Sequence, residues 1–505
     1  MGLSFTVKIR IIFLGILLLI LFAYLPWLFL VILILNFLLN IASQSLHFVA
    51  AVLPKAKIVK VPSVDTPFVS IHVPCYNEPP EILKNTLKSL ANLDYQNYEV
   101  ILIDTNTKDK MVWQPVEKYC ELLGEKFKFY HVDKLDGFKA GALNYIKAMV
   151  NPLAEYEAVV DADYEVKPEF VHEALRYFSD EKIAFVQFPQ AYFNVFEKNR
   201  PISLEYQFFF LSYMNMANIF NCVSSTGTVT FYKIEPMKEV GLYSEKCITE
   251  DAEIGLRINR FGYKGIFVNK VLARGLIPYD LEAFKKQKSR WCSGNAQILR
   301  SNLKDMIINA KEMTILQKIG FITQLTAWID FLLLPILTLV AVFFYEKYAV
   351  AASSHLVYAL IYLTAATTLI TYSFLKLLSF LFVFKGRGKL INTIGAYFVH
   401  IGMSWLYATA WLEGIFSESM SFQRTNKFIL PTMPNLLKNT ICEFTLGLLA
   451  LFISVQYLIE SNFISSLIYF WLFVVLFSVY YVHLKIKPTK LYSKSLIAHF
   501  AKEGS

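Results

Sequence analysis

One stretch predicts the fold of the central part of the chain: FVSIHVPCYNEPPEILKNTLKSLANLDYQNYEVILIDT, residues 68–105. Residues 68–76 form an apolar run rich in β-branched side chains, which is typical of a buried strand. A helical pattern follows over 80–93, and a second strand pattern covers 99–105. A strand, a helix and a strand in this order make one unit of a parallel sheet.

The same alternation continues toward the C-terminus. Strand patterns recur at 126–132 and 156–164, and further helices are expected to begin at Met111, Lys139 and Pro168. This alternation predicts an open, mostly parallel, doubly wound α/β sheet, in which ligands bind at the carboxyl ends of the strands. The polar side chains expected at these ends are Asn77, Glu78, Asp104, Asp161 and Asp163.

Apolar segments flank the α/β region on both sides. No charged residue occurs from position 11 to position 53, which is long enough for two membrane helices that turn near Pro26. Later apolar runs cover 319–345, 356–384, 390–412, 441–459 and 463–482. The chain is 55% hydrophobic and 18% charged, against about 45–50% and about 25% in soluble proteins. A multi-pass membrane protein is therefore expected.

The charges of the connecting loops predict their sides of the membrane. The basic connections are 385–389, 424–427 and 485–490, and the connections expected outside are 346–348 and 460–462. Basic loops favour the cytoplasmic side. The basic connections 385–389 and 424–427 can lie on the same side of the membrane only if 390–412 lies in the interface or re-enters without crossing. Six spanning helices are then expected, two before the α/β domain and four after it.

These expectations divide the chain into four parts. They are two N-terminal spanning helices at 1–53, a cytoplasmic domain at 54–314 that ends in an interfacial helix, a C-terminal bundle at 315–484 and a basic tail at 485–505. The expected location is the cell membrane, with lipids as partners.

Charge and cysteine usage exclude other classes. The net charge of +9 is accounted for by basic cytoplasmic loops and phosphate contacts, so nucleic acid is not an expected partner. The six cysteines are far apart and form no CxxC pair, which favours free thiols in a reducing compartment.

Two aspartates, Asp161 and Asp163, lie at the end of an apolar strand. Carboxylates one residue apart can share Mg²⁺ or Mn²⁺, and such a cation can hold a diphosphate. The alternative is that these are ordinary aspartates at a strand-to-loop junction.

Two further motifs lie on predicted helices. Thr249-Glu250-Asp251 precedes a helical stretch at 252–262, where acidic residues can simply cap a helix. Gln287, Arg290 and Trp291 share one helical face, so that a diphosphate can take the guanidinium while a sugar stacks on the indole. The alternative for this segment is an amphipathic interfacial helix.

The order of these motifs resembles the D, DxD, TED, QxxRW series of membrane-embedded, processive family 2 glycosyltransferases, the cellulose, hyaluronan and chitin synthase group. The resemblance covers about 65–310. It implies a GT-A domain inserted in a bundle of membrane helices.

The resemblance also implies a role for each motif residue. Asn77, Glu78 and Asp104 resemble the uridine-binding part of the family's site, and Lys139 in GFKAGALN resembles its lysine beside the nucleotide. Asp161 would contact the nucleotide sugar and Asp163 the metal, Mg²⁺ or Mn²⁺.

On the acceptor side, Asp251 of the Thr249-Glu250-Asp251 motif matches the family's general base. Gln287 and Arg290 would bind the diphosphate, and Trp291 the acceptor sugar. The loop SSTGT (224–228), which contains Ser225, Thr226, Gly227 and Thr228, occupies the place of the loop that meets the acceptor, although it departs from the FxVGT and CGS versions.

A further match lies beyond the α/β domain. FQRTNK (422–427) resembles the FxVTxK gating loop of cellulose synthases, with arginine in place of valine. A gating loop at 418–430 would place Thr425 and Lys427 near phosphate, and the alternative is a basic juxtamembrane loop.

The function that follows is inverting transfer from a cytoplasmic UDP-sugar to a growing β-linked polysaccharide, which is threaded outward past polar positions such as Asp330. RWCSGNAQIL (290–299) resembles the RWxxGxxQI of β-glucan synthases, so UDP-glucose is the first choice of donor. UDP-GlcNAc, GDP-mannose and transfer of one sugar to a lipid stay open. A transporter is disfavoured because four ordered motifs lie in a large soluble insertion.

Overall fold

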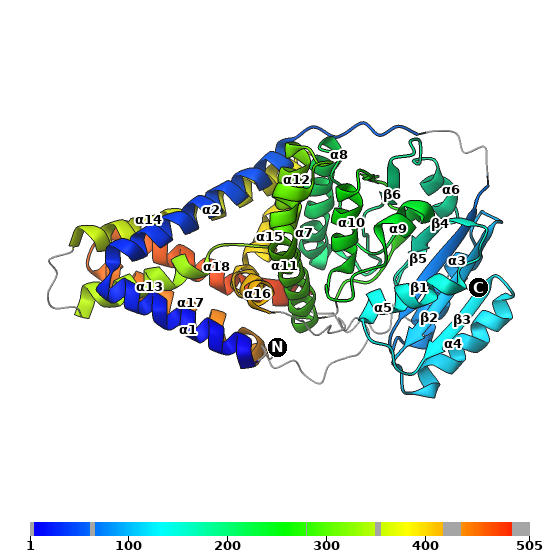
Figure 1. The fold of residues 1–505 in the computed structure, drawn as a ribbon. Helices are drawn as coiled ribbons and strands as arrows, with labels where there is room; N and C mark the ends of the chain where they lie inside the picture. The colour runs from blue at the N-terminus through cyan, green and yellow to red at the C-terminus, as the bar shows by residue number, and fades with distance from the viewer. Residues whose placement is uncertain (1–4, 61–65, 279, 349–354, 418–435, 487–505) are drawn as a thin grey trace.

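The computed structural model describes residues 5–60, 66–278, 280–348, 355–417 and 436–486. A β-sheet domain lies at one end of the molecule and a bundle of long apolar helices at the other (Figure 1). The chain begins in the bundle with α1 (Phe5–Tyr24) and α2 (Pro26–Val52). Pro26 is the first residue of α2, where a proline costs no helical hydrogen bond, and this explains the turn between the two helices.

The domain is built on a seven-stranded sheet in the order β3-β2-β1-β4-β7-β6-β8. The strands are β1 (Phe68–Cys75), β2 (Tyr98–Thr105), β3 (Phe127–Val132), β4 (Ala154–Val159), β6 (Ile183–Gln187), β7 (Thr230–Lys233) and β8 (Lys264–Phe267), and β5 (Glu165–Val166) pairs separately with β9 (Ala273–Arg274). β7 runs antiparallel to both of its neighbours, and the other neighbouring pairs are parallel. The mostly parallel sheet expected from the strand patterns is confirmed.

The central strands of the sheet are stabilised by burial of their apolar side chains. Every residue of β2 is buried, as is every residue of β1 after Phe68, because these strands lie inside the sheet with helices on its faces. The helices of the domain are α3 (Pro80–Ala91), α4 (Lys110–Leu123), α5 (Phe138–Tyr145), η1 (Ile146–Met149), α6 (Phe170–Leu175), η2 (Glu197–Asn199), α7 (Arg200–Leu211), α8 (Tyr213–Ile219), α9 (Ile234–Val240), α10 (Glu250–Arg260), α11 (Leu281–Lys304) and η3 (Asp305–Asn309).

The second half of the bundle follows α11. Its helices are α12 (Ile315–Leu325), α13 (Leu333–Tyr348), α14 (His355–Val383), α15 (Leu390–Ile401), α16 (Ser404–Phe416), α17 (Leu436–Ile459) and α18 (Phe463–Ile486). Among the described residues, four helices are long and apolar enough to cross a membrane, namely α2, α14, α17 and α18.

Six spanning helices are therefore not confirmed. The apolar stretch Ile9–Tyr24 of α1 is shorter than the roughly 20 residues of a crossing helix. The expected span 319–345 is broken between α12 and α13, and Asp330 lies in the break. A buried acidic residue and the end of a helix interrupt the apolar run there.

The stretch 390–412 forms two short helices, α15 and the greater part of α16. The helices have 12 and 13 residues, so neither reaches the length of a crossing helix. α15 packs against α7 of the sheet domain, where a side chain on Gly395 would collide with Pro201. This stretch therefore ties the bundle to the domain.

Ion pairs identify the two ends of the bundle. Lys347, in the last turn of α13, pairs with Glu460, so the C-terminal ends of α13 and α17 meet. Lys389 pairs with Glu197 of the domain at 3.0 Å, so the loop after α14 lies at the domain end. The end of α13 at 346–348 and the connection 460–462 thus lie together at the end of the bundle away from the sheet (Figure 1).

Candidate active site

A cavity of about 640 Å³ opens at the carboxyl ends of the parallel strands. Its wall includes Glu78 after β1, Asn106 after β2 and Asp161 after β4. The predicted site residues that line it are Glu78, Lys139, Asp161, Asp163, Thr226, Thr249, Glu250, Asp251, Gln287, Arg290 and Trp291. Motifs up to 213 residues apart, from Glu78 to Trp291, are thus brought to one place.

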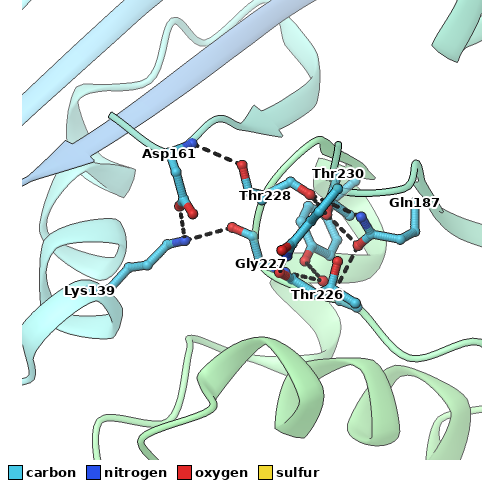
Figure 2. A network of polar contacts seen from close by, with 10 residues as sticks. Lys139, Asp161, Gln187, Thr226, Gly227, Thr228 and Thr230 are labelled. Carbon is cyan, nitrogen blue, oxygen red and sulfur yellow. Dashed lines mark hydrogen bonds and ion pairs between the residues drawn. The ribbon is translucent and has the colours of Figure 1, made fainter. Parts of the chain in front are cut away.

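Lys139 holds two parts of the cavity wall together. Its ammonium donates to Asp161 Oδ1 at 2.5 Å and to the carbonyl oxygen of Gly227 at 2.6 Å (Figure 2). Burial favours the neutral amine, but the charges of Asp161 and Glu250 outweigh it and raise the pKa of Lys139. The lysine is therefore a fixed positive charge beside the strand end, where a phosphate group can bind.

Asp163 is more enclosed than Asp161. Its Oδ2 accepts a hydrogen bond from the Leu276 amide at 2.9 Å, which orients the carboxylate at the cavity wall. Both aspartates offer oxygen atoms, the ligand type that Mg²⁺ and Mn²⁺ prefer. No group of three or more His, Cys, Asp or Glu side chains in the described ranges is arranged to hold a metal by itself.

The acidic pair Glu250 and Asp251 opens α10, with Thr249 as the residue before the helix. Thr249 makes no side-chain capping bond, whereas Asp251 Oδ1 accepts from the Ala252 amide at 2.9 Å. Burial raises the pKa of both carboxyls, against the lowering effect of Lys139 and Arg290. A buried carboxylate with a raised pKa is suited to accept a proton at neutral pH.

The helix α11 presents Gln287, Arg290 and Trp291 to the cavity on one face, as their spacing predicts. Tyr206 of α7 donates a hydrogen bond to Gln287 Oε1. The indole of Trp291 lies edge-on to the Tyr206 ring, with centroids 5.8 Å apart, and 5.5 Å from that of Trp328. The indole is thus held by other aromatic rings at the edge of the cavity.

A second, smaller cavity of about 80 Å³ adjoins the first on the side of α12. Thr226, Asp251 and Trp291 line both cavities. Ser225 lines the small cavity only, while Gly227 and Thr228 contribute backbone and hydroxyl contacts behind the wall. Asp251 therefore lies between two spaces, one ringed by charges and one by aromatic and polar groups.

Asn77 and Asp104 are not among the described residues that line either cavity. Asp104 is 2% exposed. Its carboxylate accepts a hydrogen bond from Thr107 Oγ1 and contacts His131 Nδ1, each at 2.7 Å. The backbone amide of Asn77 donates to the same threonine hydroxyl at 2.8 Å. The strand-end rule placed the backbone correctly, but local hydrogen bonds turn Asp104 behind the wall that Asn106 forms.

Thr425 and Lys427 lie outside the described residues, as does the whole expected gating loop 418–430.

Sequence reasoning missed several residues of the wall. Tyr76, Asn106, Phe138, Gln190 and Tyr192 line the main cavity. Tyr76 and Asn106 directly follow strands, so the strand-end rule contained a signal for them. The other three reach the cavity from loops or a helix start that no motif marks.

A buried ion pair behind Trp291 was also missed. Lys288 Nζ lies 2.7 Å from Glu205 Oε2, and both side chains are fully buried. The ammonium lies 3.9 Å from the Trp328 ring centroid and 4.9 Å from that of Trp291. Burial lowers the pKa of Lys288 to about 8. Burial acts to raise the pKa of Glu205, but Lys288 and His400 together outweigh it, so the net shift is downward.

The mostly parallel seven-stranded sheet with a polar cavity at its carboxyl ends is typical of the GT-A fold of glycosyltransferases. The family model of glycosyl transferase family 2 matches residues 70–241, and that of glycosyl transferase family group 2 matches residues 158–384. The two matches together run from residue 70 to residue 384, more than half of the 505 residues. The chain belongs to glycosyltransferase family 2.

Known relatives agree with this assignment. The chain is 28% identical over 253 residues to the cellulose synthase catalytic subunit (UDP-forming) of Pseudomonas fluorescens, which covers 48% of this chain and 33% of that protein. It is 27% identical over 271 residues to the probable glucomannan 4-beta-mannosyltransferase 10 of Arabidopsis thaliana, which covers 50% of this chain and 47% of that protein. The match thus spans between a third and a half of the length of these relatives.

Among solved structures, the mannosyltransferase PcManGT from Pyrobaculum calidifontis in complex with GDP-Man and Mn²⁺ is 16% identical, with a TM-score of 0.49. The alignment covers 76% of this chain and 97% of that one.

Proposed function

We propose that the protein is a processive, inverting polysaccharide synthase of the cell membrane, with its catalytic domain in the cytoplasm. The observation that carries the proposal is the position of Asp251 on the wall shared by the two cavities. A donor in the charged cavity and an acceptor in the aromatic one would meet at this carboxylate. Both the cellulose synthase and the glucomannan mannosyltransferase relatives are named for polysaccharide synthesis.

The charged cavity suits a nucleotide diphosphate sugar. Lys139 of α5 and Arg290 of α11 both line the space and supply positive charge to it. Mg²⁺ usually takes one or two carboxylates together with substrate phosphates and water. Asp161 and Asp163 fit that pattern as the residues that would hold a cation arriving with the nucleotide. When bound, the cation would neutralise negative charge on the diphosphate.

In the proposed reaction, Asp251 accepts the proton of an acceptor hydroxyl. The hydroxyl oxygen forms a bond to the anomeric carbon while the bond from that carbon to the diphosphate oxygen breaks, and the nucleoside diphosphate leaves. One displacement inverts the anomeric configuration. Lys139 and Arg290 stabilise the leaving diphosphate, and the indole of Trp291 stacks on the acceptor ring.

Polar groups inside the bundle support outward movement of the product. The α2 residues Asn40, Ser43 and Gln44 are buried, and their side-chain polar atoms have no hydrogen-bond partner among the described residues. The same holds for Tyr407 Oη and for Asp330 Oδ2. Hydroxyl groups of a sugar chain would satisfy such atoms, which are costly to leave unpaired in an apolar bundle. Asp330 is therefore proposed as part of the product path.

The ends of the bundle support a cytoplasmic domain. The basic loop 385–389 lies at the domain end, and positively charged loops favour the cytoplasm. α15 and α16 then lie on the cytoplasmic side as interfacial helices. On this topology the loop 418–430 is cytoplasmic, and we propose it as a gating loop with Thr425 and Lys427 near phosphate.

UDP-glucose is the proposed donor, supported by the RWCSGNAQIL segment and by the cellulose synthase relative. GDP-mannose is the second candidate because several relatives are named as mannosyltransferases.

A donor panel tests the proposal. Purified protein in lipid vesicles would receive radiolabelled UDP-glucose, GDP-mannose or UDP-GlcNAc with Mg²⁺ or Mn²⁺. We expect incorporation into polymer from one donor, and its loss when EDTA removes the cation. Full activity in EDTA would exclude Asp161 and Asp163 as metal ligands, and no incorporation from any donor would contradict the function.

A further inference from the structure

Two buried glutamines hold the loop that separates the two cavities. Gln187 is the last residue of β6, and Gln324 lies on α12 next to the membrane bundle. Their exposed fractions are 0% and 2%. Both amides bond to the segment 222–230, Gln324 near its start and Gln187 near its end.

Gln187 uses its whole hydrogen-bonding capacity on or beside this segment. Its Nε2 donates to the carbonyl oxygens of Phe188 at 2.7 Å and Thr228 at 2.9 Å. Its Oε1 accepts from the Thr226 amide at 2.8 Å and from Thr230 Oγ1 at 2.6 Å (Figure 2). A glutamine amide has two donor hydrogens and two acceptor lone pairs, so all four are used.

Gln324 holds the other end of the segment. Its Nε2 donates to the Cys222 carbonyl at 2.8 Å, and its Oε1 accepts from the Ser224 amide at 3.2 Å. Because Gln324 lies on α12, this end of the loop is fixed to the helix that leads into the bundle.

The loop between the glutamines is strained and contacts the proposed base. Gly227 and Val229 have φ values of +73° and +53°. A left-handed conformation is unfavourable for a β-branched valine and persists only where neighbouring contacts enforce it. A Cβ atom on Gly227 would lie 2.6 Å from Asp251 Oδ2, and one on Gly255 of α10 would lie 2.6 Å from the Ser225 amide nitrogen. The loop and α10 are thus in direct contact, so the place of one sets the place of the other.

Thr226 is the residue that this arrangement places at the junction of the cavities. It lines both of them, and its hydroxyl oxygen has no hydrogen-bond partner among the described residues. This hydroxyl is buried, and a buried hydroxyl without a partner is costly, so a sugar hydroxyl that reaches the junction would be stabilised by bonding to it.

We propose that Gln187 and Gln324 are positioning residues that fix the segment 222–230, so that Thr226 receives the acceptor sugar beside Asp251. The role in acceptor transfer rests on the proposed function, whereas the fixing of the loop does not. Gln324 also makes acceptor placement depend on α12, so the site is built jointly by the sheet and the bundle.

Amide hydrogen exchange tests, without any substrate, whether the two glutamines hold the segment 222–230. Gln187→Met and Gln324→Met keep side-chain length and remove the amide. Gln187→Met is expected to speed exchange of the Thr226 amide at least tenfold, and Gln324→Met that of the Ser224 amide. Gln207→Met is the matched control, because among the described residues the side chain of Gln207 bonds to Ser203, within α7. If Gln187→Met does not fold, Gln187→Asn shortens the side chain by one carbon and draws the amide oxygen away from the Thr226 amide, while it keeps a neutral polar group at this buried position. Unchanged exchange rates in folded variants would contradict the claim that the glutamines hold this segment.

Transfer is then compared with hydrolysis of the donor by water. Both variants are expected to lower acceptor transfer at least tenfold relative to donor hydrolysis, with the dissociation constant for the nucleoside diphosphate and Mg²⁺ changed less than threefold. General unfolding would lower transfer and hydrolysis together. Faster exchange with an unchanged ratio of transfer to hydrolysis would also overturn the positioning role. If the unmodified protein transfers sugar from no donor, the proposed function fails, and the exchange result alone decides whether the glutamines hold the loop.

Discussion

Asp251 is the residue on which the proposed chemistry depends. It lies between the charged and aromatic cavities, and no other carboxylate of the described residues lines both. Asp251→Asn should lower kcat by about 10²- to 10⁴-fold, the usual contribution of a general base. Binding of the nucleoside diphosphate should change little, since the residues around Asp161 and Arg290 hold it. Calorimetric titration beside a rate assay checks this, and an equal loss of affinity and rate would contradict the base assignment.

The pH dependence of the rate follows from the same carboxyl. Burial raises the pKa of Asp251 and of its neighbour Glu250. A protonated base cannot accept a proton, so kcat/KM should fall as the pH drops through the raised pKa of this pair. Glu250→Gln removes a nearby negative charge, which should lower the pKa of Asp251 and move the acidic limb to lower pH. A rate that is constant from pH 5 to 9, or a limb that moves upward in the variant, would contradict this account.

Most residues of the site could be predicted from sequence because their motifs follow strands or begin helices. Asp161 follows β4 and Asp251 begins α10, and both reach the cavity for this reason. Arg290 reaches it from within α11, on the helical face that its spacing from Gln287 predicts. Asp104 ends its strand as predicted, but His131 on the neighbouring strand binds its carboxylate. Glu205 could not be predicted, because its partner Lys288 lies far along the chain and only the packing of α7 on α11 brings the two together.

At the scale of elements, the Lys288–Glu205 pair joins α11 to α7 behind Trp291. Lys288→Met would leave Glu205 buried without its main countercharge, which typically costs about 3–5 kcal/mol. The apparent melting temperature in detergent should fall by roughly 5–10 °C.

The double variant Lys288→Met, Glu205→Gln provides the control for this pair. It removes both charges, so it should recover most of the lost stability. If the single and double variants melt at the same temperature, the pair does not stabilise the contact between these helices.

The elements themselves were predicted with unequal success. The first four long strands have strong apolar runs, and the structure places them at or within a few residues of the predicted positions. β7 has only four residues, too few for an apolar run that would predict a strand, and its antiparallel direction departs from the alternating pattern. The break between α12 and α13 depends on tertiary burial of Asp330, which local hydropathy does not reveal.

At the scale of the whole molecule, the loops at the two ends of the bundle should face opposite sides of the membrane. Single cysteines at Gly388 and Ser461, both exposed, would be introduced in a background without the six native cysteines. A membrane-impermeant thiol reagent should label Gly388→Cys from the cytoplasmic side and Ser461→Cys from the outside. Labelling of both from one side would contradict the proposed topology.

The central claim is that one site at the junction of the sheet domain and the bundle makes a polymer. The most direct test follows product size over time with the radiolabelled donor, the purified protein in vesicles and Asp251→Asn as the inactive control. The account predicts long chains at early times, when most protein molecules have not yet started a chain, and no such chains in the control. A product that carries one sugar and remains in the lipid fraction at all times would contradict it.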